Sequence, residues 1–307
     1  MNNKLQLASV ALAPLLFLGC GGGSSTSSSG SVTLRVTDAP VDSADAVWVQ
    51  FSGVEIHGSA ARYTYYFCKD PVSGSTFTSA SICQESAPKR INLLALTNGT
   101  SDLLLDDQTL ATGQYQWIRL MVDAVPNQRD SYIVVSGAEH ELEIPSGAES
   151  GLKLNRGFDV TASGNVDFTI DFDLRKSVHM SKSGSTYKLR PTLRIVDNTQ
   201  TGTLSGTVAT ALVTSNCSGG VYLFSGHNIT PDDIGSSTEP VVTALISQDN
   251  LTAAFNYKLS FVEAGDYTVA FTCNASTDAP DTNDSVTFSA TTNVTVTSST
   301  NVVQALN

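Results

Sequence analysis

The chain has 307 residues, 17 of them basic and 29 acidic, which gives a formal net charge of −12. A chain this acidic repels the phosphate backbone of nucleic acids, which proteins bind through clustered Lys and Arg, so we expect no nucleic-acid partner. Apolar residues make up 41% of the chain, enough for packed cores. The abundance of Thr, Ser, Val and Gly favours strands over helices.

The first twenty residues have the layout of a secretory signal peptide. Lys4 precedes an apolar run that begins near Leu7 and ends at Leu18-Gly19-Cys20. At about 12 residues this run is too short to cross a membrane as a helix, which takes about 20. Residues 17–20 (Phe-Leu-Gly-Cys) resemble the lipobox of bacterial lipoproteins, although Phe stands where that family usually has Leu. The alternative is an ordinary secretory signal followed by a chance Cys.

The lipobox resemblance implies that Cys20 takes a diacylglycerol, becomes the first mature residue and holds the chain on a lipid bilayer. Residues 1–19 are then the signal peptide, and residues 20–30 are the lipidated Cys with a flexible Gly/Ser tether. Lipoproteins with Asp after the Cys tend to stay at the inner membrane. Gly21 and Gly22 instead imply the outer membrane of a Gram-negative envelope, facing either the periplasm or the outside.

Residues 31–200 are predicted to form a first β domain, which opens with a strand at residues 32–37. A second strand is expected at residues 46–57, with a bulge at Ser52-Gly53. Residues 166–174 alternate between apolar even positions and polar odd ones, and we expect residues 187–196 to be their hairpin partner. Lys188, Arg190 and Arg194 would then lie on the same face as Asp171 and Asp173. Further strands are expected at residues 62–67, 115–122, 131–136 and 139–144, whereas the runs at 91–96 and 102–106 fit either a strand or a helical turn.

A polar break at residues 197–201 predicts a domain boundary, and residues 201–307 a second β domain. Its expected strands lie at residues 202–208, 220–224, 241–246, 255–261, 267–273, 286–290 and 292–303. About seven short strands with frequent turns favour a β-sandwich. The predicted fold class is therefore all-β, with two β-sandwich-like domains after the signal peptide and tether.

Besides Cys20, the chain has Cys68, Cys83, Cys217 and Cys273. An exported chain meets an oxidising compartment, and four Cys allow three pairings. If the two domains are separate, Cys68–Cys83 and Cys217–Cys273 are the pairings that stay within a domain. Cys217 lies near one predicted strand and Cys273 at the end of another, where a disulfide could staple the two sheets of a sandwich.

A Gly-x-Tyr pattern follows an apolar residue and two spacers, and precedes a strand, in both domains. It consists of Gly113 and Tyr115 in the first domain and of Gly265 and Tyr267 in the second. Gly supplies a positive φ where a tight turn needs one, and the Tyr hydroxyl can reach a backbone group while its ring enters the core. The pattern favours two related domains, and a coincidence of turn chemistry is the alternative.

Three segments carry a family resemblance: residues 32–42 with Thr37-Asp38-Ala39-Pro40, residues 103–115, and residues 189–195 with Leu-Arg-Pro-Thr-Leu-Arg-Ile. Together they resemble the bacterial lipoprotein domain known as domain of unknown function 4382, over residues 31–198. The second domain is similar, more weakly, to transthyretin-like or carboxypeptidase-regulatory-like sandwiches. Neither resemblance implies a catalytic residue.

The sequence holds no recognisable catalytic motif, so we expect no enzymatic activity. Its four His are isolated, and it has no Cys-x-x-Cys, phosphate loop or Gly-x-Ser-x-Gly elbow. Asp38, Asp42 and Asp45 cluster in one expected turn and are candidate Ca²⁺ ligands. Asp278, Asp281 and Asp284, around Pro280, form a similar loop and are a weaker candidate. The alternative for them is a turn in which Asp bonds its own backbone. No other cofactor is expected.

The sequence therefore predicts a membrane-anchored, non-catalytic lipoprotein that acts in binding, adhesion or envelope assembly, with a glycan or an envelope protein as partner. One alternative is a carbohydrate-binding or glycan-acting protein that uses its carboxylates with Trp48, Tyr63, Tyr65 and Tyr66. A second is a calcium-stabilised surface adhesin. Which of them applies depends on how the carboxylates and aromatic rings are arranged in space.

Overall fold

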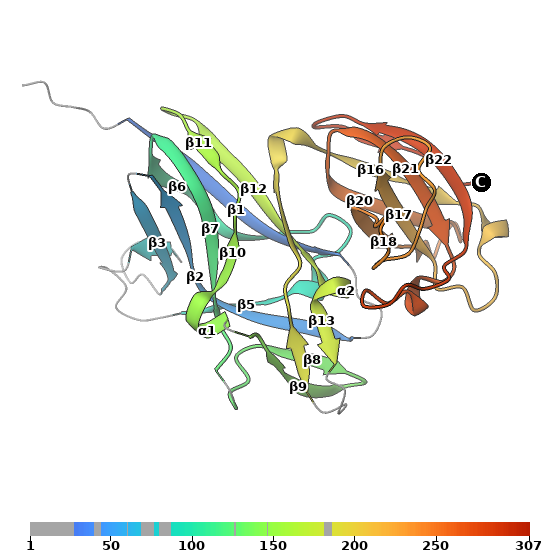
Figure 1. Cartoon of the computed structure of the whole chain (residues 1–307), viewed down its shortest axis with the longest axis horizontal. Helices are drawn as coiled ribbons and strands as arrows, with labels where there is room; N and C mark the ends of the chain where they lie inside the picture. Colours follow the sequence, from blue (N-terminus) through green and yellow to red (C-terminus); the bar gives the residue numbers. More distant parts are fainter. Residues whose placement is uncertain are drawn as a thin grey trace, which may run out of the picture.

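The computed structural model describes residues 28–39, 44–59, 61–68, 77–79, 87–125, 127–145, 147–180 and 186–307. These residues are almost all in β-structure or in the turns between strands, which confirms the predicted all-β class (Figure 1). The two α-helices, α1 (Gly147–Ser150) and α2 (Leu174–Ser177), are one turn each. Within the described ranges, no helix has the length and apolar character needed to span a membrane.

The strands of the described residues are divided between four sheets, two before residue 198 and two after it. The first fifteen strands are β1 (Ser29–Ala39), β2 (Ala46–Gly58), β3 (Arg62–Phe67), β4 (Phe77–Ser79), β5 (Lys89–Asn92), β6 (Asp102–Ala111), β7 (Gly113–Asp123), β8 (Tyr132–Val135), β9 (Ala138–Glu143), β10 (Leu152–Leu154), β11 (Phe158–Val160), β12 (Asn165–Asp173), β13 (Val178–Met180), β14 (Tyr187–Leu189) and β15 (Leu193–Asp197). The later strands are β16 (Thr201–Val208), β17 (Gly220–Ser225), β18 (Val242–Leu245), β19 (Ser247–Gln248), β20 (Phe255–Glu263), β21 (Gly265–Thr272), β22 (Phe288–Val296) and β23 (Asn301–Val303). Single 3₁₀ turns occur at η1 (Leu93–Ala95), η2 (Asn198–Gln200), η3 (Thr210–Leu212) and η4 (Ala275–Thr277).

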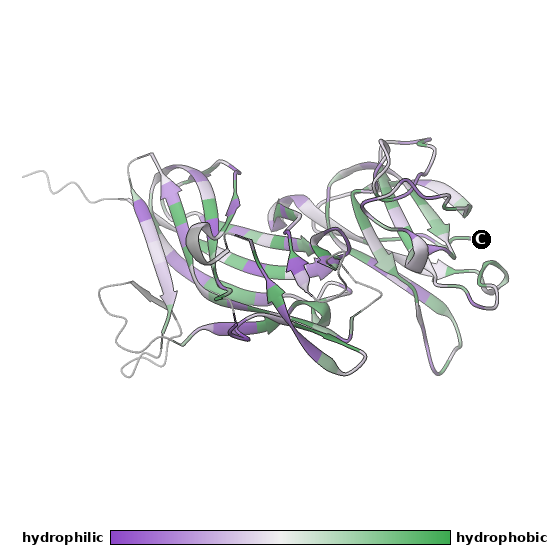
Figure 2. Cartoon of the chain, turned by 60° about the horizontal axis from the view of Figure 1, so that its bottom comes forward, coloured by the Kyte–Doolittle hydropathy of each residue, from purple (hydrophilic) through white to green (hydrophobic). Residues whose placement is uncertain are grey.

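Two facing sheets enclose the first core. One has the strand order β15-β12-β1-β6, and the other follows β10-β7-β2-β8-β9-β14-β13, with β3 and β5 also paired to β2. Apolar side chains from β1 and β12 and from β2 and β7 form one buried cluster, in which the ring centroids of Phe51 and Phe172 lie 6.2 Å apart. Figure 2 shows apolar and polar bands alternating along these strands, as expected for sheets with one face in a core.

The predicted hairpin partner of residues 166–174 is correct only in its second half. β15 pairs antiparallel with β12 and places Arg194 opposite Asp171, with Nη2 and Oδ2 2.7 Å apart. β14 pairs instead with β13 and β9, so Lys188 forms its ion pair with Glu143. On its other side β12 pairs in parallel with β1. This pairing places the apolar faces of both strands in one core.

The predicted bulge in β2 is confirmed by a register shift between Phe51 and Gly53 against β7. The tether predicted to reach residue 30 ends earlier, since Ser29 and Gly30 already pair with β6. Residue 30 has to be Gly because the backbone of residues 161–164 lies against it. A Cβ there would lie 2.5 Å from the carbonyl oxygens of both Thr161 and Gly164. The start of β1 is thus packed under the turn between β11 and β12.

The strands after residue 200 form two four-stranded sheets, β19-β20-β16-β23 and β18-β17-β21-β22. Apolar residues of both sheets make one core, with Leu204 and Leu259 from the first and Leu223 and Phe271 from the second. This arrangement is a β-sandwich.

The disulfide between Cys217 and Cys273 is present, with their Cα atoms 4.6 Å apart. It does not staple the two sheets as expected. Cys217 precedes β17 and Cys273 follows β21, and these strands are antiparallel neighbours in one sheet, so the bond joins adjacent strand ends. Cys68 is also disulfide-bonded, but Cys83 lies outside the described residues, and the Cys68–Cys83 pairing stays a prediction.

Replacing Cys217 and Cys273 together with Ala is expected to lower the free energy of unfolding by about 4 kcal/mol, because the bond closes a long loop in the unfolded chain. Urea unfolding followed by fluorescence measures the change against the wild-type protein, with both proteins under oxidising conditions so that the disulfide of Cys68 stays intact. A loss below about 1 kcal/mol would show that the bond does not restrain the unfolded chain in this way.

Candidate functional site

A buried polar network joins the first group of sheets to the second. Asp173 ends β12, and its side chain accepts a hydrogen bond from the backbone N–H of Lys176, which caps α2. Arg175, the second residue of α2, is 7% exposed and extends toward the second sandwich. Its Nη1 donates to the hydroxyl of Tyr222 at 2.9 Å, and its Nη2 donates to the carbonyl oxygens of Ala275 and Asp278.

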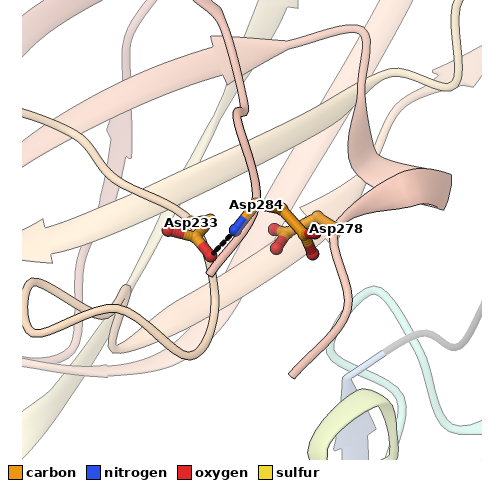
Figure 3. Close-up of side chains that lie close together, drawn as sticks. All are labelled: Asp233, Asp278 and Asp284. Carbon is orange, nitrogen blue, oxygen red and sulfur yellow. Dashed lines mark hydrogen bonds between the residues drawn. The ribbon is translucent and has the colours of Figure 1, made fainter. Parts of the chain in front are cut away.

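The network continues into an acidic cluster, formed by Asp233, Asp278 and Asp284 (Figure 3). One carboxylate oxygen from each lies within 4.8 Å of the others. Asp278 accepts hydrogen bonds from the Tyr222 hydroxyl at 2.5 Å and from the backbone N–H of Ile234 at 3.0 Å. Asp233 accepts the backbone N–H of Asp284 at 2.7 Å through Oδ2, the contact drawn as a dashed line.

Burial sets the electrostatics of this cluster. It raises the pKa of the Asp278 carboxyl, against the opposing effects of the Tyr222 hydrogen bond and the Arg175 charge. Asp233 is fully buried, and its Oδ1 has no hydrogen-bond partner among the described residues. A buried carboxylate oxygen without a partner is uncommon. Three carboxylates close together, one of them with such an oxygen, provide the kind of ligand that Ca²⁺ takes.

A second candidate site is a groove on the outer face of the larger sheet, where β3, β2, β7 and β10 lie side by side (Figure 1). Its volume is about 370 Å³, and its lining includes Ser52, Glu55, Arg62, Thr64, Tyr66 and Arg119. The bulge at Gly53 re-aims the outward side chains of β2, so that Glu55 faces Thr64 on one side and Arg119 on the other.

Two cations, Arg62 and Arg119, line one end of this groove, and Lys153 adjoins it opposite Arg119 in the β7–β10 register. The Glu55 side chain is 4% exposed and forms ion pairs with Nε of Arg62 and with Nη1 of Arg119. The Arg119 guanidinium and the Lys153 ammonium lie 4.9 and 4.7 Å from the ring centroid of Trp117, as cation–π partners. His57 stacks on the same ring, with the two centroids 4.7 Å apart.

The predicted calcium ligands are not brought into one visible site. Asp38 is buried in β1. Asp45 precedes β2, and its Oδ2 accepts the backbone N–H of Gly137 at 2.8 Å. Asp42 lies outside the described residues, as does the predicted lipidation site Cys20, so both assignments stay predictions. The acidic cluster that the fold does assemble takes Asp278 and Asp284 from the weaker candidate loop and adds Asp233, whereas Asp281 contacts His179.

The two Gly-x-Tyr patterns have the same tyrosine geometry. The Tyr115 hydroxyl donates to the carbonyl of Ala111, and the Tyr267 hydroxyl to the carbonyl of Glu263, each at 2.8 Å and four residues back along the chain. The glycines differ: Gly113 has a φ of +144°, whereas no positive φ occurs at Gly265.

Most of the aromatic residues considered for glycan binding have structural contacts. Tyr65 is buried, and its hydroxyl donates to the Thr109 carbonyl, while Trp48 stacks on Tyr132. Tyr66 is the member of that set that lines the groove.

Sequence reasoning missed Trp117, Arg119 and Lys153. The period of two in β7 indicated that Trp117 and Arg119 share a face, but the cross-strand register with Glu55 was needed to find the site.

The sequence of residues 29–191, more than half of the chain, matches the family model described as Domain of unknown function (DUF4382). The chain belongs to this family. The DUF4382 region comprises the two facing sheets of the first core as far as β14, together with α2, Arg175 and the outer groove. No curated protein matches the sequence.

Solved structures give weak similarities. A leucine-rich repeat protein from Bacteroides thetaiotaomicron aligns at 12% identity and a TM-score of 0.21, over 91% of this chain and 26% of that protein. The minor pilin of Streptococcus agalactiae aligns at 12% identity and a TM-score of 0.19, over 90% of this chain and 94% of the pilin. A family 26 carbohydrate-binding module from Eubacterium rectale, in complex with maltoheptaose, aligns at 10% identity and a TM-score of 0.20, over 89% of this chain and 91% of the module. Similarities at this level carry no functional assignment.

The raised pKa of Asp278 predicts a pH dependence of stability. A carboxyl whose folded pKa is raised adds stability that is fully present below its unfolded pKa and is lost as the pH rises through the folded pKa. The wild-type unfolding free energy minus that of Asp278→Asn should therefore fall as the pH rises above about 4. Asp106→Asn, which removes an exposed carboxyl from β6 in the first group of sheets, is the control. A difference curve that is flat or that rises would contradict this assignment.

Proposed function

We propose that this DUF4382 protein is a non-catalytic lipoprotein of the bacterial envelope, held on a lipid bilayer through Cys20, with its β-sheets serving to bind a ligand. The observation that carries the proposal is the Lys4-to-Cys20 pattern, followed by Gly and Ser up to the first residues of β1. Since Ser29 is already paired with β6, the intervening residues would link the acylated Cys directly to the folded part.

The arrangement of the carboxylates supports a binding function over a catalytic one. The clustered Asp side chains accept hydrogen bonds from backbone N–H groups and from Tyr222, and Glu55 is held between two guanidinium groups. Such contacts suit side chains that position other groups. They do not suit a general acid, which has to exchange its proton with a substrate.

Mass spectrometry of the mature chain tests the anchor. We expect an amino-terminal peptide that begins at Cys20 and carries a diacylglyceryl thioether, and a protein that partitions into the detergent phase. Cys20→Ser should abolish both, and Gly21→Asp should keep the lipid but move the protein from the outer to the inner membrane on a density gradient. An unmodified thiol at Cys20 in the wild-type protein would refute the proposal.

A calcium-stabilised adhesin is the second candidate function. It is favoured by the buried, unpartnered Oδ1 of Asp233 beside Asp278 and Asp284. Extracellular calcium sites bind in the range of about 0.1–1 mM, so about 1 mM Ca²⁺ should raise the melting temperature and a chelator should lower it. Asp284→Asn should remove that response, while Asp249→Asn, in a hairpin turn of the same domain, should keep it. A melting temperature that does not respond to Ca²⁺ would eliminate this candidate.

A further inference from the structure

We propose that the outer groove formed by β3, β2, β7 and β10 binds a glycan that carries carboxylate groups. This inference rests on the proposed binding function and names the chemical class of the ligand. It is carried by a row of cations at one end of the groove, in a chain whose net charge is −12: Arg62 and Arg119 line the groove beside Glu55, and Lys153 adjoins the lining opposite Arg119. The second carboxylate of the lining, Asp123, accepts a hydrogen bond from Gln50. The row of Arg62, Arg119 and Lys153 with Glu55 has a formal charge of +2, being three cations and one anion.

The register places these charges side by side. Glu55 lies opposite Arg119 across the β2–β7 pair, and Arg119 lies opposite Lys153 across the β7–β10 pair. Arg62 reaches Glu55 from β3. Because outward side chains on neighbouring strands stand about 5 Å apart, the three cations span a short row that crosses the sheet.

Glu55 acts as a positioning residue for the two guanidinium groups. It holds Nε of Arg62 and Nη1 of Arg119, and a guanidinium carries five N–H donors, so both arginines retain donors for a ligand. Arginine binds carboxylates through two parallel hydrogen bonds, which fixes the orientation of the bound group. Lys153 is exposed and held over Trp117, so it adds a third cation without a carboxylate of its own among its described contacts.

The rest of the groove suits a sugar. Ser52 and Thr64 offer hydroxyl groups, and Tyr66 offers a phenol and an apolar ring face. At the far end, Asp123 accepts a hydrogen bond from the Gln50 amide at 2.9 Å. A volume of about 370 Å³ is in the range of sites for small organic ligands and exceeds the needs of one inorganic anion.

Nucleic acid fits this groove less well. DNA carries one charge per roughly 1.7 Å and is bound through many phosphate contacts, which three cations on an acidic protein do not supply. A carboxylated glycan spreads its charge over one group per sugar ring, so one or two carboxylates can meet the cationic row while the remaining ring atoms contact Tyr66 and the hydroxyl groups. The groove thus favours a ligand that is anionic but not densely charged.

Isothermal titration of the full-length protein in detergent, with oligogalacturonate as the probe, tests the inference. We expect binding that the Arg62→Gln, Lys153→Gln double variant weakens by roughly tenfold or more, since it removes two charge-assisted contacts. Arg129→Gln removes an exposed cation outside the groove, paired with Glu139, and should leave the affinity unchanged. Binding should also weaken between about 0.1 M and about 1 M NaCl, because salt screens exposed charges.

The ligand-side comparison needs no variant and remains decisive if the double variant fails to fold. Fully methyl-esterified oligogalacturonate has the same sugar rings without the charge and should not bind. Three outcomes would overturn the inference. The ester binds as tightly as the acid, the double variant and Arg129→Gln change the affinity equally, or oligogalacturonate does not bind at all. Tighter binding of glycerol 3-phosphate, the soluble headgroup of an anionic lipid, would also overturn it. A lipidated chain that fails these tests loses the glycan assignment alone, because the anchor is measured separately at Cys20.

Discussion

The parallel pairing of β1 with β12 is the constraint on which the rest of the structure depends. It joins residues about 130 positions apart along nine consecutive pairs, and most of its apolar side chains are fully or almost fully buried against the opposite sheet. Removing those side chains from water is the main source of stability, and no local pairing could bury the same face. The pairing also fixes where β12 ends, at Asp173, and therefore where α2 begins.

The junction between the two groups of sheets follows from that position. Asp173 caps α2, and Arg175 then enters the second sandwich, where Tyr222 and two backbone carbonyls accept its donors. A buried guanidinium is costly unless its hydrogen bonds are satisfied, and this one has partners on the second sandwich. The interaction therefore favours one relative placement of the two parts, with the Asp233, Asp278 and Asp284 cluster directly behind Tyr222.

The two candidate sites differ in the physical role of charge. At the junction, burial disfavours the ionised form of the Asp278 carboxyl and raises its pKa. Most polar atoms there form hydrogen bonds within the protein. On the outer sheet, the cations are partly or largely exposed and outnumber the carboxylate that holds two of them. An exposed, preorganised cationic row suits recognition of a ligand, whereas the buried network suits the joining of domains.

The sequence by itself determined the all-β class, because alternating apolar residues and Thr- and Val-rich runs have the period of strands. It also determined the bulge at Gly53, the cysteines of the Cys217–Cys273 bond and the family of the first region. The tertiary structure decided what depends on register between distant strands. β14 pairs with β9 and not with β12, the disulfide lies within one sheet, and Glu55 contacts Arg62 and Arg119. Periodicity tells which face of a strand a side chain takes, but the partner strand is set by burial of the whole core, to which residues far apart in the chain contribute together.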